Sequence, residues 1–198
     1  MLGANKIKKE IKHGNIVIAP FTEDQLNPNS YDIRLGNWFI EENVSNLPVD
    51  LTRANADWNL WQKPRKVDNE CLFILEPGAY ILAHTIEIVG STKYATLLKA
   101  RSTFARCGID ICASAGFGDV GYVNHWTLEI KNNTRNSIIL QPKMRVAQIA
   151  FIKVQEASQY QGAYQSRVTA CSWNNPLEIA STYDPLSMLP KLGYSRVF

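Results

Sequence analysis

Short alternations of apolar and polar residues, separated by turn signals, make up most of the chain. Residues Tyr31–Gly36 alternate as a strand with one buried face does, and Trp38–Ile40 continue the pattern. Two further strands are predicted at Cys71–Leu75 and Tyr80–Glu87, split by Glu76–Gly78, where Pro presets one φ angle and Gly supplies a positive one. The other predicted strands are 16–18, 94–99, 138–140 and 146–154.

One helix is predicted near the N-terminus. Asn5 is suited to cap a helix over Lys6–His13, Ile7 and Ile11 share one face of it, and Gly14 ends it. Many short strands with a single clear helix predict a mainly β domain, either a barrel or a sandwich.

Two segments lack this periodicity. Residues 43–69 are polar and irregular and indicate a surface insertion, with Trp58 and Trp61 as isolated anchors. Residues 171–198 carry Trp173 and three prolines, and we expect an extended arm that packs on its own subunit or on a neighbour.

Composition narrows the classes of function. The length of 198 residues fits one domain, and 45% hydrophobic with 20% charged residues supports a packed core. A net charge of +3 without a basic run argues against a nucleic-acid-binding protein. The four cysteines form no CxxC pair and no zinc pattern, and no segment is typical of a signal peptide or a membrane span. We therefore expect reduced thiols, a cytoplasmic location and no membrane partner.

Candidate chemistry gathers between residues 101 and 129. Arg101, Ser102, Thr103 and Arg106 place cations and hydroxyls close together, and such groups suit phosphate oxygens. A Gly-rich turn and the carboxylate of Glu129 follow, so this stretch can anchor phosphates and act on the group that they carry.

Four stretches in the same order resemble the dCTP deaminase branch of the trimeric dUTPase superfamily. They are Asn27–Gly36, Arg101–Gly108, Ala115–Tyr122 with Thr127–Glu129, and Arg145–Ile149. The resemblance covers residues from about 5 to 165, and it implies a distorted β-barrel, dUTPase-like β-clip domain at 1–165, followed by a C-terminal lid and arm at 166–198. It further implies a homotrimer with active sites shared between subunits. The expected location is the cytoplasm of the cell, or the cytoplasm of the host if the protein is viral.

The resemblance also implies roles for individual residues. Glu129 would be the catalytic acid and base, Ser102 and Arg106 would hold phosphates and take part in catalysis, and Arg101 would support the site across the interface. Asp119 would meet the 3′-hydroxyl, and Tyr122 would pack on the deoxyribose. The implied nucleotide-binding set is Arg101, Ser102, Thr103, Phe104, Ala105, Arg106, Asp119, Tyr122, Thr127, Leu128, Glu129, Gln148 and Tyr160.

The chemistry of deamination agrees with that assignment. Water must add at C4 of cytosine and ammonia must leave, and one positioned carboxyl can carry both proton transfers. Zinc deaminases use an HxE and PCxxC signature, which is absent because residues 84–87 read His-Thr-Ile-Glu and no PCxxC exists. We expect no zinc, no metal ligand from protein side chains, and Mg²⁺ bound through the triphosphate.

Plainer interpretations exist for the same residues. Glu129 shares one strand face with Thr127 and Lys131, which is also typical of a solvent-facing acid, and His125 is more typical of a structural histidine. Three departures from the family pattern stand out. Val120 replaces a proline, Lys143 replaces a glycine, and residues 158–165, which resemble the lid segment of relatives, lack its lysine, for which Arg167 is the candidate substitute.

Four functions fit the pattern. The first is dCTP deamination to dUTP and ammonia, and the second is a bifunctional enzyme that also gives dUMP and diphosphate. The third is a plain dUTPase, which Glu129 argues against because dUTPases have an apolar residue there. The fourth is a non-catalytic nucleotide-binding module.

Overall fold

A computed structural model describes residues 1–44, 46, 48–51, 60–164 and 183–191. Within these residues the main sheet has nine strands, in the order β7-β9-β5-β2-β11-β6-β8, with β1 added to β5 and β3 added to β2. The strands are β1 (Ile16–Ala19), β2 (Tyr31–Glu41), β3 (Arg65–Lys66), β4 (Phe73–Leu75), β5 (Tyr80–Ser91), β6 (Tyr94–Ala100), β7 (Ile109–Asp110), β8 (Phe117–Gly118), β9 (Val123–Asn132), β10 (Ile138–Leu140) and β11 (Arg145–Lys153). Strands β4 and β10 pair separately.

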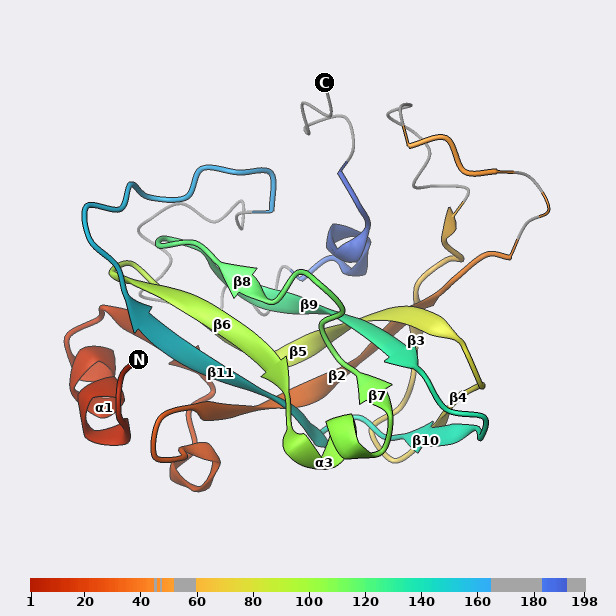
Figure 1. Ribbon diagram of the computed structural model, residues 1–198, viewed down its shortest axis with the longest axis horizontal. Helices are drawn as coiled ribbons and strands as arrows, with labels where there is room; N and C mark the ends of the chain where they lie inside the picture. The colour runs from red at the N-terminus through yellow and green to blue at the C-terminus, as the bar shows by residue number, and fades with distance from the viewer. Residues whose placement is uncertain (45, 47, 52–59, 165–182, 192–198) are drawn as a thin grey trace.

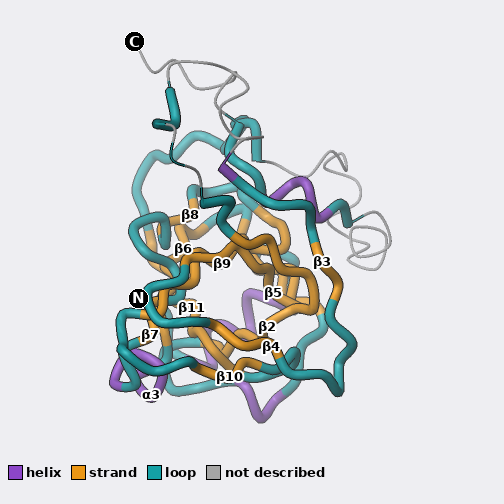
Figure 2. The backbone as a smooth tube through the Cα atoms, turned by 90° about the vertical axis from the view of Figure 1, so that its right-hand side faces the viewer, coloured by secondary structure: helices purple, strands orange, loops and turns teal. Residues whose placement is uncertain are grey.

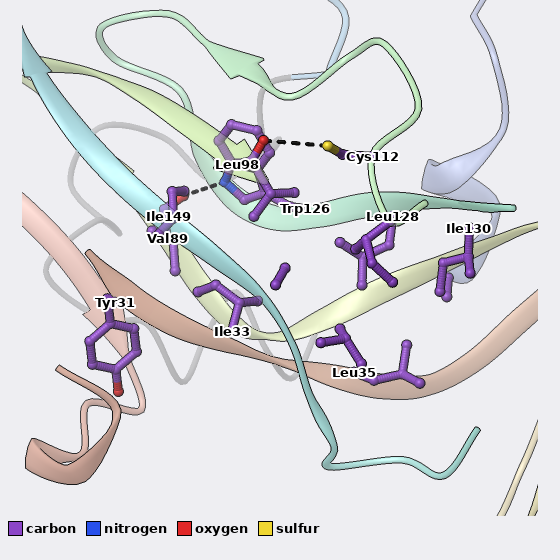
Figure 3. Close-up of a cluster of buried hydrophobic side chains, with 14 of the residues drawn as sticks. Tyr31, Ile33, Leu35, Val89, Leu98, Cys112, Trp126, Leu128, Ile130 and Ile149 are labelled. Atoms are coloured by element: carbon purple, nitrogen blue, oxygen red, sulfur yellow. Dashed lines mark hydrogen bonds between the residues drawn. The ribbon is translucent and has the colours of Figure 1, made fainter. Parts of the chain in front are cut away.

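The sheet curls around one core, which the views in Figures 1 and 2 show from two directions. Side chains from β2, β6, β9 and β11 point into the same interior, among them Ile33, Leu98, Leu128 and Ile149 (Figure 3). Each of these four is at most 1% exposed. The predicted mainly β, barrel-like fold with a short N-terminal helix is confirmed.

Strand β9 sets the two faces that matter for the site. Trp126, Leu128 and Ile130 are 4%, 0% and 0% exposed, whereas Thr127 and Glu129 are only partly buried on the opposite face. The indole N–H of Trp126 donates to the carbonyl of Val89 at 3.0 Å, which fixes β9 against β5 (Figure 3). The alternation read from the sequence is therefore confirmed.

Side chains of the His-Thr-Ile-Glu segment, residues 84–87, form hydrogen bonds within the sheet. Glu87 is fully buried and accepts hydrogen bonds from the Arg34 backbone at 2.8 Å and from Arg34 Nε at 2.6 Å. His84 donates from Nδ1 to the Thr85 carbonyl at 2.9 Å and accepts at Nε2 from the Asn37 backbone at 3.2 Å. Burial lowers the pKa of His84 to about 3, so this imidazole stays neutral.

Two α-helices and two short 3-10 turns complete the described chain. They are α1 (Ala4–Lys12), η1 (Glu23–Gln25), α3 (Ser102–Arg106) and η3 (Pro185–Met188). The predicted cap at Asn5 was wrong: Gly3 precedes the helix, because the bond from the Ala4 N–H to the Pro28 carbonyl, 2.8 Å long, starts the helix earlier. Residues Ser102–Arg106, for which the sequence pattern predicts no helix, form the short helix α3.

Other predicted bounds also shift. The strand expected from Cys71 begins at Phe73, because a turn bonds the Cys71 N–H to the Asp68 carbonyl at 2.9 Å. The strand expected to end at Glu87 runs on to Ser91, because β1 pairs with its last residues. The insertion at 43–69 contains β3 and the buried Trp61, while Trp58 lies outside the described residues.

Candidate active site

A pocket of about 350 Å³ opens over the outer face of β9. Its polar lining includes Asp119, Thr127 and Glu129, and Tyr80, Tyr122 and Tyr160 add aromatic rings with hydroxyl groups. Its apolar lining includes Trp61, Leu82, Phe117, Met188 and Pro190. The pocket therefore places one half-buried carboxyl beside flat apolar surfaces, an arrangement that suits an aromatic base.

The carboxyl of Glu129 sits between opposing influences. Burial raises its pKa, and hydrogen bonding from the backbone N–H groups of Ser114 and Ala115 acts in the opposite direction. Glu129 pairs with Leu82 on the neighbouring strand β5, and Leu82 is 4% exposed. A raised pKa moves the carboxyl toward the range in which it can both accept and return a proton.

Close packing fixes the loop that carries Asp119. A Cβ atom on Gly118 would lie 2.3 Å from Thr96 Oγ1 and 2.5 Å from the ring of Trp126, so only glycine lets β8 lie against that ring. Gly121 has a φ of +95°, a conformation that glycine adopts without strain. Asp119 is exposed at the rim of the pocket.

Aromatic rings support the side of the pocket next to Asp119. Tyr122 makes edge contacts with Trp126 and Tyr160, at centroid distances of 5.4 and 5.5 Å. Burial raises the pKa of Tyr122, so its hydroxyl remains protonated. The Tyr160 N–H donates to the Val120 carbonyl at 2.7 Å, which joins the start of the predicted lid to the β8–β9 loop.

The predicted phosphate-binding residues lie elsewhere in the subunit. Helix α3 stands at the end of β6 that is remote from β8 (Figure 1). Ser102, Thr103 and Arg106 are exposed there, and none of them lines the pocket. Arg101 forms an ion pair with Asp32 at 3.3 Å and donates to the Arg145 carbonyl at 3.3 Å.

Gln148 also lies outside the pocket. It is on β11, and Ser30 Oγ donates to its Oε1 at 3.5 Å. Leu128 is fully buried in the core, so only its backbone is available to a ligand. Within one subunit the structure thus brings Asp119, Tyr122, Thr127, Glu129 and Tyr160 together and leaves the 101–106 segment and Gln148 apart.

Several lining residues have no counterpart in the sequence prediction. Leu82 and Tyr80 come from β5, Trp61 from the insertion, Tyr164 from the lid segment, and Met188 with Pro190 from the C-terminal arm. Trp61 offered one signal, as a large aromatic residue in a polar stretch. The others look like ordinary core or loop residues in sequence.

No group of three or more His, Cys, Asp or Glu side chains among the described residues is placed to hold a metal ion. No helix in the described part of the chain is long and apolar enough to cross a membrane.

The fold is a curled β-sheet with a carboxyl-containing pocket on its outer face, and comparison of the chain with known protein families gives its class. The dCTP deaminase-like family matches residues 1–154. The chain belongs to this family.

Two curated relatives share the printed name "dCTP deaminase, dUMP-forming". The protein from Nanoarchaeum equitans is 35% identical over 167 residues, which are 78% of this chain and 84% of the relative. The protein from Hathewaya histolytica is 35% identical over 170 residues, which are 84% of this chain and 91% of the relative.

A solved structure shares the fold. The 2′-deoxycytidine 5′-triphosphate deaminase from Agrobacterium tumefaciens aligns with a TM-score of 0.57 and 23% identity. The alignment covers 76% of this chain and 47% of the other. At this identity the likeness concerns the fold alone.

Proposed function

We propose that this protein deaminates dCTP and then cleaves the resulting dUTP, giving ammonia, dUMP and diphosphate. The half-buried carboxyl of Glu129 in a pocket with apolar and aromatic walls carries the proposal. Its motif position in a chain of this family supports the choice of substrate. The printed name of the two relatives favours the dUMP-forming reaction over release of dUTP.

In the first step, Glu129 takes a proton from water as the oxygen adds to C4 of cytosine. The carboxyl gives this proton to the ring nitrogen. It then takes the second proton of the former water from the C4 hydroxyl and passes it to the amine, so that the C4 carbonyl forms, one water has entered and one ammonia leaves. Burial of the carboxyl supports this shuttle because it raises the pKa. Thr127, on the same face of β9, is assigned to the base or its water.

In the second step, water attacks the α-phosphorus of dUTP and diphosphate leaves. Asp119 is an exposed carboxylate that lines the pocket, and we assign it to the 3′-hydroxyl of the sugar. Tyr122 packs on the deoxyribose. Mg²⁺ bound to the triphosphate would neutralise charge on the leaving diphosphate.

The phosphates themselves are assigned to a neighbouring subunit. Ser102 and Arg106 lie outside the Glu129 pocket of their own subunit, and their exposure on α3 leaves them available to a second copy. We propose a homotrimer in which Arg101, Gln148 and the 101–106 segment of one chain complete the pocket of the next. The proposal includes residues 1–165 as the catalytic domain, 166–198 as lid and arm, and a cytoplasmic location.

A product balance tests the proposed function. Purified protein is incubated with dCTP and Mg²⁺, and ammonia, dUTP, dUMP and diphosphate are followed together. We expect ammonia, dUMP and diphosphate in equal amounts. Accumulation of dUTP would instead support deamination alone, turnover of added dUTP without deamination would support a dUTPase, and binding without any product would support a non-catalytic module.

A further inference from the structure

The C-terminal arm contributes to the Glu129 pocket, although it lies beyond the family match at 1–154. We propose that residues 183–191 form a wall of the nucleotide site, with Met188 as a specificity-determining residue against the base and Lys191 as a positioning residue that holds the lid segment. This inference rests on the proposed function and extends it to a segment that the family match does not reach.

The arm is anchored at its first described residue. The ring of Tyr183 stacks on His84 at a centroid distance of 4.5 Å and meets the edge of His125 at 4.8 Å. His125 shares the outer face of β9 with Thr127 and Glu129. The described part of the arm therefore starts against the strand that carries the candidate catalytic carboxyl.

Two residues in the middle of the described part of the arm are as buried as core residues. Met188 and Leu189 are 4% and 7% exposed, and they form a second apolar cluster with Ile40, Trp61 and Leu82. The turn η3 is capped by Asp184, whose Oδ1 accepts from the Leu186 N–H at 2.9 Å. Met188 and Pro190 then line the pocket that holds Glu129. An apolar wall here reduces the access of water to the carboxyl and offers a surface to a pyrimidine ring.

The last described residue of the arm, Lys191, is joined to the lid segment. Lys191 Nζ donates to the Ala163 carbonyl at 2.8 Å and lies 5.0 Å from the centre of the Tyr164 ring. The Lys191 N–H donates to the Tyr164 hydroxyl at 3.0 Å. Tyr164 also lines the pocket, so the arm fixes a lid residue at the edge of the site.

We expect weaker nucleotide binding when the apolar wall, or the contacts of the Lys191 side chain with Ala163 and Tyr164, are removed. Met188→Ala takes away apolar contact with the base. Lys191→Ala removes the bond to the Ala163 carbonyl and the cation contact with the Tyr164 ring, and it keeps the backbone bond to the Tyr164 hydroxyl. Each is expected to weaken dCTP binding about tenfold. Lys191→Arg keeps a cation and a donor and should restore most of the affinity. Leu186→Ala is the matched control, since Leu186 belongs to the same turn but is 40% exposed and lies outside the pocket.

The experiment uses the full chain with Glu129→Gln, which prevents turnover, and measures the Kd for dCTP with Mg²⁺ by calorimetry. Melting temperatures of all variants are recorded to separate folding from binding. Equal affinity of Met188→Ala, Lys191→Ala and Leu186→Ala would overturn this inference alone. Failure of the Glu129→Gln parent and of the wild-type chain to bind dCTP would overturn the inference together with the proposed function.

Discussion

At the scale of single residues, Glu129 shows what sequence can and cannot supply. Alternation along 126–131 predicts correctly which face of the strand carries the carboxyl. It cannot predict that the face is half-covered, because Trp61, Tyr80 and Met188, which line the pocket, lie up to 68 positions away in the sequence. The degree of burial, which shifts the pKa, is a property of the folded chain.

This burial has a consequence for stability. The pKa of Glu129 is raised in the folded state, so the folded chain binds the proton more tightly than the unfolded chain does. The stability from this group is therefore greatest at low pH and is lost as the pH rises through the folded pKa. Glu129→Gln stays neutral, so we expect it to melt no lower than wild type at pH 7.

The comparison is repeated at about pH 4, below the ordinary Glu pKa of 4.5. There both side chains are largely neutral, and any advantage of the variant should shrink. A variant that melts clearly lower than wild type at pH 7 would show that the ionised carboxyl stabilises the fold, against this account.

At the scale of elements, strands with a two-residue period were predictable and their ends were not. Residues 31–41, 94–100 and 145–153 form strands where alternation and turn signals predict them. The ends depend on partners, as when β1 extends β5 to Ser91. Helix α3 was missed because five residues are too few to establish a helical period.

The turn before β11 makes an element-scale prediction. Lys143 has a φ of +73°, in the left-handed region that glycine adopts without strain, and its N–H donates to the Leu35 carbonyl at 2.8 Å. The resemblance to the dCTP deaminase branch implies a glycine at this position, and here a lysine bears the strain of the turn. We expect Lys143→Gly to be more stable than Lys143→Ala by about 1 kcal/mol.

The alanine variant is the matched control, because both changes remove the exposed ion pair with Glu70, whose atoms are 3.7 Å apart. An exposed ion pair of this kind contributes little to the free energy of unfolding. Urea denaturation of the three proteins measures the difference, and an alanine variant as stable as the glycine variant would show that the backbone is not strained there.

At the scale of the whole molecule, the predicted site residues lie in two separate places of one subunit. The motif residues supply about half of one pocket. The rest comes from the insertion, β5, Trp126, the lid segment and the arm. The 101–106 segment lies outside that pocket. Spacing along a sequence cannot show whether two motifs meet within one chain or between chains, because a symmetric assembly can join residues that a single chain holds apart.

Subunit mixing tests the shared site. Arg106→Ala and Glu129→Gln chains are unfolded together and refolded as mixed trimers, whose size is checked by sedimentation. If each site combines Glu129 of one chain with Arg106 of the next, about a quarter of the sites become complete. The control mixes Asp119→Ala with Glu129→Gln, two residues of the same pocket, and should stay inactive. Equal activity in both mixtures would contradict a shared site.

The central claim is that Glu129 performs the proton transfers of dCTP deamination, and its most direct test is ammonia release by the Glu129→Gln chain. The amide keeps the shape of the side chain but cannot shuttle a proton, so the rate should fall by about 10²–10⁴-fold while dCTP binding stays within a few-fold of wild type. Glu70→Gln, the same change at an exposed site, should release ammonia at the wild-type rate. A Glu129→Gln chain that also releases ammonia at nearly the wild-type rate would contradict the account.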